Sequence, residues 1–170
     1  LLRTTGGFLF SYIFEDGSFG HDLSEGGDWA IKITGTGGTG GNANQVNCNA
    51  NQMGVQTTSI LTGQTMTIEF DDEGASGSAN PAYIAKIGIM GLENSETVDW
   101  VAHLTNGGTP LTGTATATSL VNGELTIIAP SGYYIDDVVL APGVDSKVGV
   151  TSITTYIYDD THTAELNFNF

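Results

Sequence analysis

The sequence consists of short apolar runs with the spacing of β-strands, and this pattern limits the fold more than any other feature. Apolar residues alternate with polar ones or form brief β-branched runs, and both patterns favour strands over helices. Clusters of Gly, Asn, Ser and Asp separate the runs, and the chain contains 24 Gly. The pattern predicts strands at 8–14, 29–34, 53–57, 66–70, 83–90, 97–104, 113–117, 123–128, 135–141, 150–158 and 164–170.

So many short strands in 170 residues predict a single all-β domain (1–170), folded as an antiparallel β-sandwich of the jelly-roll type. The pairs Asn106-Gly107 and Asn122-Gly123 predict tight hairpins, because both residue types tolerate a positive φ. The inner faces of the sheets are expected to carry Phe10, Phe14, Ile31, Ile33, Ile68, Phe70, Ile87, Ile89, Trp100, Ile127, Val139, Ile153 and Tyr156.

Acidic side chains greatly outnumber basic ones, with 19 Asp and Glu against 4 Lys and Arg and a formal net charge of −15. This charge has the wrong sign for binding nucleic acid or an anionic membrane surface. Several acids are adjacent, as in Asp71-Asp72-Glu73 and Asp136-Asp137, and adjacent like charges repel one another. Ca²⁺ would neutralise them, because it binds several hard oxygen ligands.

We therefore expect Ca²⁺ as a cofactor, bound among carboxylates at the ends of the apolar runs. The alternative is a solvated acidic surface that keeps an extracellular protein soluble. The predicted metal ligands are Asp71, Asp72, Glu73, Asp99, Asp136, Asp137 and Asp145.

A Gly- and Thr-rich segment at 35–41 leads into an Asn- and Gln-rich segment at 42–52. It is either a flexible linker inside the domain or a ligand-binding loop, since Gly lets the backbone approach a ligand and amides both donate and accept hydrogen bonds. The residues predicted to bind a ligand are Asn44, Gln45, Asn47, Asn49, Asn51, Gln52 and Asp136.

No catalytic motif is evident, and we expect a binding protein rather than an enzyme. The three histidines His21, His103 and His162 lie in unrelated surroundings, and the Gly-x-Ser-x-Gly motif of α/β-hydrolases does not occur. Cys48 is the only cysteine, so the chain has no internal disulfide. No basic and apolar signal peptide opens the sequence, and we expect the chain to be excised from a longer secreted polypeptide.

From residue 53 onward, the order of short motifs is characteristic. It includes Met-Thr-Ile-Glu-Phe at 66–70, Ala-Lys-Ile-Gly-Ile-Met at 85–90, Val-Asp-Trp-Val-Ala at 98–102 and Tyr-Ile-Asp-Asp-Val-Val-Leu-Ala-Pro at 134–142. This order resembles the ligand-binding β-sandwich modules near the C-terminal end of giant repeats-in-toxin (RTX) adhesins of Gram-negative bacteria.

The resemblance implies a calcium-dependent module of an extracellular adhesin at the bacterial cell surface, acting in cell adhesion and biofilm formation. It implies a peptide ligand, whose free C-terminus on a target-cell protein meets a bound Ca²⁺. By position, the resemblance assigns Asp136 to an acidic position of the family. It places Asp71 and Asp72 in the turn after the Glu-Phe strand, and Asp99 beside Trp100 on a strand that often carries a Trp in the family. A calcium-dependent carbohydrate-binding module and a structural extender domain are the alternatives. Peptide is preferred over sugar because the sequence offers few obviously exposed aromatic residues. We expect a monomeric module in a long chain.

Overall fold

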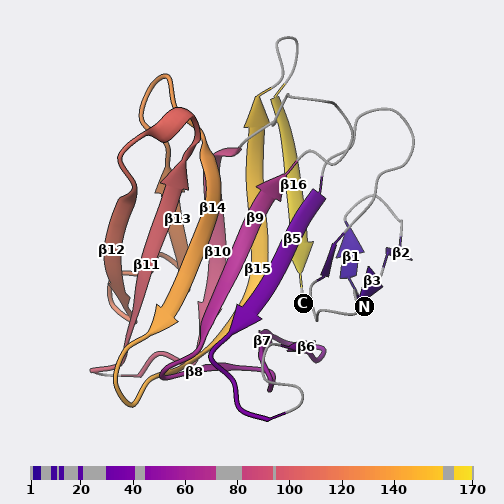
Figure 1. Cartoon of the computed structure of the whole chain (residues 1–170), viewed down its shortest axis with the longest axis vertical. Helices are drawn as coiled ribbons and strands as arrows, with labels where there is room; N and C mark the ends of the chain where they lie inside the picture. The colour runs from indigo at the N-terminus through magenta and orange to yellow at the C-terminus, as the bar shows by residue number, and fades with distance from the viewer. Residues whose placement is uncertain are drawn as a thin grey trace.

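The computed structural model shows an all-β protein (Figure 1), as predicted. It describes the backbone of residues 2–4, 9–10, 12–13, 19–20, 30–40, 45–71, 82–93, 95–158 and 163–169, and the side chains of residues 31, 33–40, 45–70, 82–93 and 95–156. Within these ranges, no helix has the length and apolarity needed to cross a membrane. The described elements are β1 (Leu2–Thr4), β2 (Leu9–Phe10), β3 (Tyr12–Ile13), β4 (Phe19–Gly20), β5 (Ala30–Thr36), β6 (Val46–Cys48), β7 (Met53–Val55), β8 (Ile60–Leu61), β9 (Thr65–Asp71), β10 (Ala82–Met90), β11 (Thr97–Leu104), the 3-10 turn η1 (Thr105–Gly107), β12 (Leu111–Thr116), β13 (Glu124–Ile128), β14 (Ile135–Pro142), β15 (Lys147–Tyr158) and β16 (Thr163–Asn169).

The described strands pair antiparallel in two runs that are joined into one sheet. One run is β12-β11-β14-β9-β5-β4-β3, and the other is β13-β10-β15-β16-β1-β2. The pair Ala82–Ile135, between β10 and β14, links the two runs. Figure 1 shows β11, β14, β9 and β5 in front of β13, β10 and β15. The all-β class is therefore confirmed, and the finer jelly-roll description stays a prediction. At the ends of the runs, β12 pairs with β11, and β13 pairs with β10.

Strand positions follow the sequence pattern closely. The strand predicted at 97–104 coincides with β11, and the other predicted strands from residue 29 onward agree with the structure within three residues at either end. The sequence pattern missed β6 and β8, which are three and two residues long and lie among Asn, Gln, Ser and Thr. It also missed the short strands β1 and β4 near the start of the chain.

The buried apolar residues form one cluster between the two runs, built by alternation along each strand. Met66 and Ile68 of β9 and Val138 and Leu140 of β14 are fully buried. The other described residues predicted for the inner faces are buried as well, apart from Trp100, Val139 and Tyr156. Phe10 and Phe14 lie outside the described side chains.

The prediction was wrong for Val139 and Tyr156, which point to the outer faces of the sheet. Val139 lies between the buried Val138 and Leu140, so it must face the other way. Tyr156 directly follows the buried Thr155, so it also faces the outer side.

Trp100 is half-buried and packs against the edge of the core. Its indole lies against Gly113 of β12, where an added Cβ would come within 2.6 Å of Cζ2 of the ring. Glycine at this position therefore makes room for the indole between β11 and β12.

Both predicted Asn-Gly turns are confirmed. Asn106 and Gly107 have φ of 57° and 69° between β11 and β12, and Asn122 and Gly123 have φ of 55° and 78° before β13. Two successive positive φ values are the geometry of a type I′ hairpin turn.

Candidate functional site

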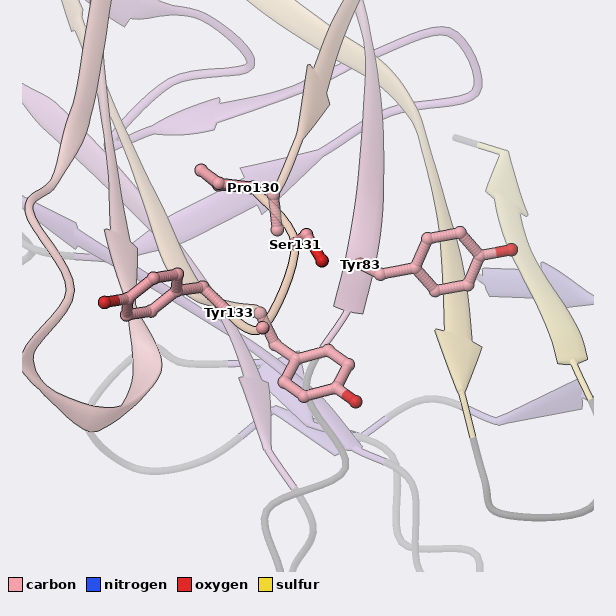
Figure 2. A pocket seen from close by; sticks show the side chains of 7 residues that line it. Tyr83, Pro130, Ser131 and Tyr133 are labelled. Carbon is pink, nitrogen blue, oxygen red and sulfur yellow. The ribbon is translucent and has the colours of Figure 1, made fainter.

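An open depression of about 330 Å³ lies where the segment between β13 and β14 passes the start of β10. Figure 2 shows Tyr83 on one side and the turn carrying Pro130, Ser131 and Tyr133 on the other. Three of its seven lining residues are tyrosines, and the other four are small. The lining residues are Tyr83, Ala129, Pro130, Ser131, Gly132, Tyr133 and Tyr134.

The local sequence explains the shape of this turn. The backbone N–H of Tyr133 donates to the carbonyl of Pro130 at 3.0 Å, and Gly132 has a φ of 86°. A positive φ at the third position of such a turn is the type II geometry, which strongly favours Gly. The turn therefore presents Tyr133 and Tyr134 in succession beside β10.

Backbone hydrogen bonds hold both ends of the segment. The N–H of Ala129 donates to the carbonyl of Tyr83 at 2.9 Å, and the carbonyl of Tyr134 accepts from the N–H of Thr105 at 3.0 Å. The first bond ties the segment to β10, and the second ties it to η1. The tyrosines are therefore carried by a fixed backbone, as a preorganised binding site requires.

The tyrosine rings are partly exposed and individually supported. Tyr133 is 40% exposed, and its ring lies against Gly108, where an added Cβ would come within 2.6 Å of Cδ1. The ring of Tyr83 lies 6.2 Å from the ring of Tyr156, with an angle of 53° between the planes. A tyrosine offers an apolar ring and a hydroxyl that donates and accepts hydrogen bonds, so the depression suits an amphipathic ligand.

The predicted metal ligands are dispersed within the described structure. Asp99, in the middle of β11, accepts a hydrogen bond from Oγ1 of Thr114 at 2.5 Å. Asp137 lies on β14 with Oδ1 2.7 Å from Nδ1 of His103. Because Asp99 pairs with Ala141, four residues along β14 from Asp137, the two carboxylates are separated by roughly 13 Å.

The other predicted metal ligands also lie apart. Asp136 is exposed next to Asp137 on β14, and Asp145 is exposed in the turn after β14 with a φ of 59°. Asp71 ends β9, and its side chain, like all of Asp72 and Glu73, lies outside the described part. Among the described residues, no three or more His, Cys, Asp or Glu gather as a metal site would require. Calcium binding therefore stays a prediction.

The amides of the predicted ligand-binding loop bond within the chain. Oδ1 of Asn49 accepts from the N–H groups of Asn51 and Gln52 at 2.8 and 3.0 Å. Nδ2 of Asn47 donates to the carbonyl of Gln56 at 2.9 Å, and Nε2 of Gln52 donates to Oγ of Ser59 at 2.9 Å. These bonds shape the β6–β7 hairpin.

The structure does not bring this loop and Asp136 together. The β6–β7 hairpin joins β15 at Val150. Asp136 follows Ile135, which pairs with Ala82, and Ala82 in turn pairs with Ile157 at the other end of β15. Seven residues of β15 separate the two places, or about 23 Å. The carbonyl of Gln45 accepts from the N–H of Gln56 at 2.6 Å, and Asn44 lies outside the described residues.

Asp136 is the predicted ligand-binding residue nearest the depression in sequence, two positions after Tyr134. Sequence reasoning missed Tyr83, Tyr133 and Tyr134 themselves. A signal was present in the run Pro-Ser-Gly-Tyr-Tyr at 130–134, because a turn followed by two aromatic residues exposes at least one of them. The contribution of Tyr83, far away in sequence, had no such signal.

The pair of His103 and Asp137 is the described feature closest to acid–base machinery, and it is not part of the lining of the depression. The absence of enzymatic activity stays a prediction. The chain matches no protein family, no curated protein and no solved structure, so the resemblance to RTX adhesin modules stays a hypothesis.

Proposed function

We propose that this protein is a carbohydrate-binding module and that the depression lined by Tyr83, Tyr133 and Tyr134 is its binding site. The observation that carries the proposal is the gathering of three partly exposed tyrosines around one open depression of about 330 Å³. Sugar rings have apolar C–H faces and a rim of hydroxyls, and tyrosine offers a matching ring face and hydroxyl. A pocket for a small molecule usually buries most of the surface of its ligand. This depression is open, so it suits one part of a larger ligand better.

The charge of the protein supports a sugar over a peptide C-terminus. A free carboxylate approaching a protein of net charge −15 is repelled unless a bound cation faces it. An uncharged sugar meets no such repulsion and requires no cation. Calcium-dependent peptide binding and a place in a surface adhesin remain predictions that depend on the resemblance and on residues outside the described part.

The proposal is tested by screening the protein on a glycan array and measuring the best ligand by titration calorimetry. Tyr133→Ala is expected to weaken binding about two- to tenfold, because an aromatic contact contributes roughly 0.5–1.5 kcal/mol. Tyr133→Phe is expected to retain the part of the affinity that comes from the ring.

Val144→Ala is the control. Val144 is 83% exposed and lies just after the end of β14, whereas the depression lies before the start of that strand. Its substitution is therefore expected to leave binding unchanged. An array without any bound glycan, or equal affinities for wild type and Tyr133→Ala, would refute the proposal.

A further inference from the structure

We propose that the binding surface continues beyond the depression over the outer face of β13, β10 and β15, and that it holds the interior of a linear, uncharged saccharide chain. This inference rests on the proposed function and deepens it, because it names the length and charge of the ligand. The evidence is the register of the three strands, the chemistry of their outer face, and its continuity with the depression.

The register places two rows of side chains on this outer face. Ala85 and Ile87 of β10 are fully buried, so Ile84 and Lys86 point outward. Ile84 pairs with Ile128 on one side and Tyr156 on the other. Lys86 pairs with Thr126 and Thr154 in the same way. The outer face therefore carries an apolar row that is three strands wide and about 10 Å across. Beside it lies a polar row in which Lys86 and Thr126 reach the surface and Thr154 is buried.

The apolar row is continuous with the depression at two points. Tyr83 lines the depression, and its ring lies 6.2 Å from that of Tyr156. Ile128 is 62% exposed and directly precedes Ala129, which also lines the depression. A ligand seated against Tyr133 can therefore extend over Tyr83 toward Tyr156 without crossing a polar gap.

The polar row supplies groups that suit hydroxyls. Nζ of Lys86 lies 5.4 Å from the centre of the Tyr156 ring and 3.9 Å from Oε1 of Glu124. The exposed hydroxyl of Thr126 lies beside Lys86 in the register, whereas Thr154, on the other side of Lys86, is buried at 7% exposure. Sugar hydroxyls both donate and accept hydrogen bonds, so they can bond to the ammonium of Lys86, the carboxylate of Glu124 and the hydroxyl of Thr126.

The same groups argue against an acidic saccharide. Glu124 offsets the charge of Lys86, and the only other cationic Lys or Arg side chain that the structure describes is Lys147, at the far end of β15. A carboxylated or sulfated chain would meet the net charge of −15 without a cluster of cations to offset it.

The test measures affinity by titration calorimetry for a neutral monosaccharide, trisaccharide and hexasaccharide built from the best sugar on the array. For the wild type, affinity is expected to rise about tenfold from the shortest to the longest ligand, since added units reach the outer face. Tyr156→Ala is expected to remove most of this rise and leave the monosaccharide affinity unchanged. Tyr133→Ala is expected to weaken all three ligands.

Two further variants keep the test independent of folding. Tyr156→Phe retains the ring and should keep the rise with length, and Ile128→Asp alters an exposed side chain and should reduce it. An acidic hexasaccharide of the same length is expected to bind more weakly than the neutral one.

The outcomes separate this inference from the proposed function. If short and long neutral chains bind equally, if neither Tyr156→Ala nor Ile128→Asp changes the rise, or if the acidic chain binds more tightly, the inference fails while the proposed function stands. If no saccharide of any length binds, both fail.

Discussion

Two adjacent valines of β14 provide a direct test of which face of the sheet is buried. Val138 is 0% exposed and pairs with Ala102 and Ile68, which are also fully buried. Val139 points to the outer face, where it pairs with Val101 and Thr67 and is only partly buried. Threonine has nearly the shape of valine, so replacing each valine by threonine changes polarity at an almost constant volume.

The two substitutions are expected to differ clearly in their cost. Val138→Thr places a hydroxyl among apolar side chains, and burying such a group without a partner costs roughly 1–3 kcal/mol. Val139→Thr leaves its hydroxyl accessible to water and should change the free energy of unfolding by no more than about 0.5 kcal/mol. A difference of about 2 kcal/mol is roughly thirty-fold in the unfolding equilibrium.

The measurement is urea unfolding followed by tryptophan fluorescence, with the midpoint and the slope compared between variants. Each valine serves as the control for the other, since residue type, strand and chemical change are the same. Equal losses, or a larger loss for Val139→Thr, would show that the faces of β14 are assigned the wrong way round. Asp137 would then face the core, and the assignment of buried and outer residues along β14 would fall with it.

Three further predictions concern packing, the depression and the metal. Gly113→Ala should lower the free energy of unfolding by about 1–3 kcal/mol, although alanine is the better strand former, because its Cβ would meet the indole of Trp100; an unchanged urea midpoint would contradict that contact. Gly108→Ala should displace the ring of Tyr133 and weaken saccharide binding, and it should also lower the melting temperature, because the added Cβ would come within 2.9 Å of Cβ of the buried Leu104; full affinity in calorimetry would count against the role of Tyr133. If the acids bind Ca²⁺, excess EDTA should lower the melting temperature, Asp72→Ala should reduce that effect, and a melt indifferent to EDTA would end the calcium hypothesis.

The strands could be predicted because their signal is local. The strand at 97–104 was placed to the residue, since polar and apolar residues alternate along most of it and Gly or Asn clusters bound it. The Asn-Gly turns could be predicted for a similar reason, because the backbone demands of a positive φ fall on the two residues themselves.

The sequence did not show which side of every strand is buried, and it did not show the depression. In β14 two acids precede three apolar residues, so the run at 138–140 has no alternation to show which side is buried. The depression depends on the approach of Tyr83 to a turn more than forty residues later, through the pairing of β10 with β13. The acidic clusters suggested that carboxylates converge, yet Asp99 and Asp137 lie four residues apart along one face.

Two of the strands at the ends of the runs, β12 and β13, also bear on how copies of the molecule behave together. Among the described strands each has a single neighbour, so each presents backbone N–H and C=O groups along its other edge. Such edges can join between molecules and lead to aggregation. Mutual repulsion at a net charge of −15 opposes that approach, but salt screens it and acid removes it by protonating carboxylates. The acidity of the surface is therefore expected to oppose aggregation, and concentrated stocks should be most soluble at neutral pH and low ionic strength.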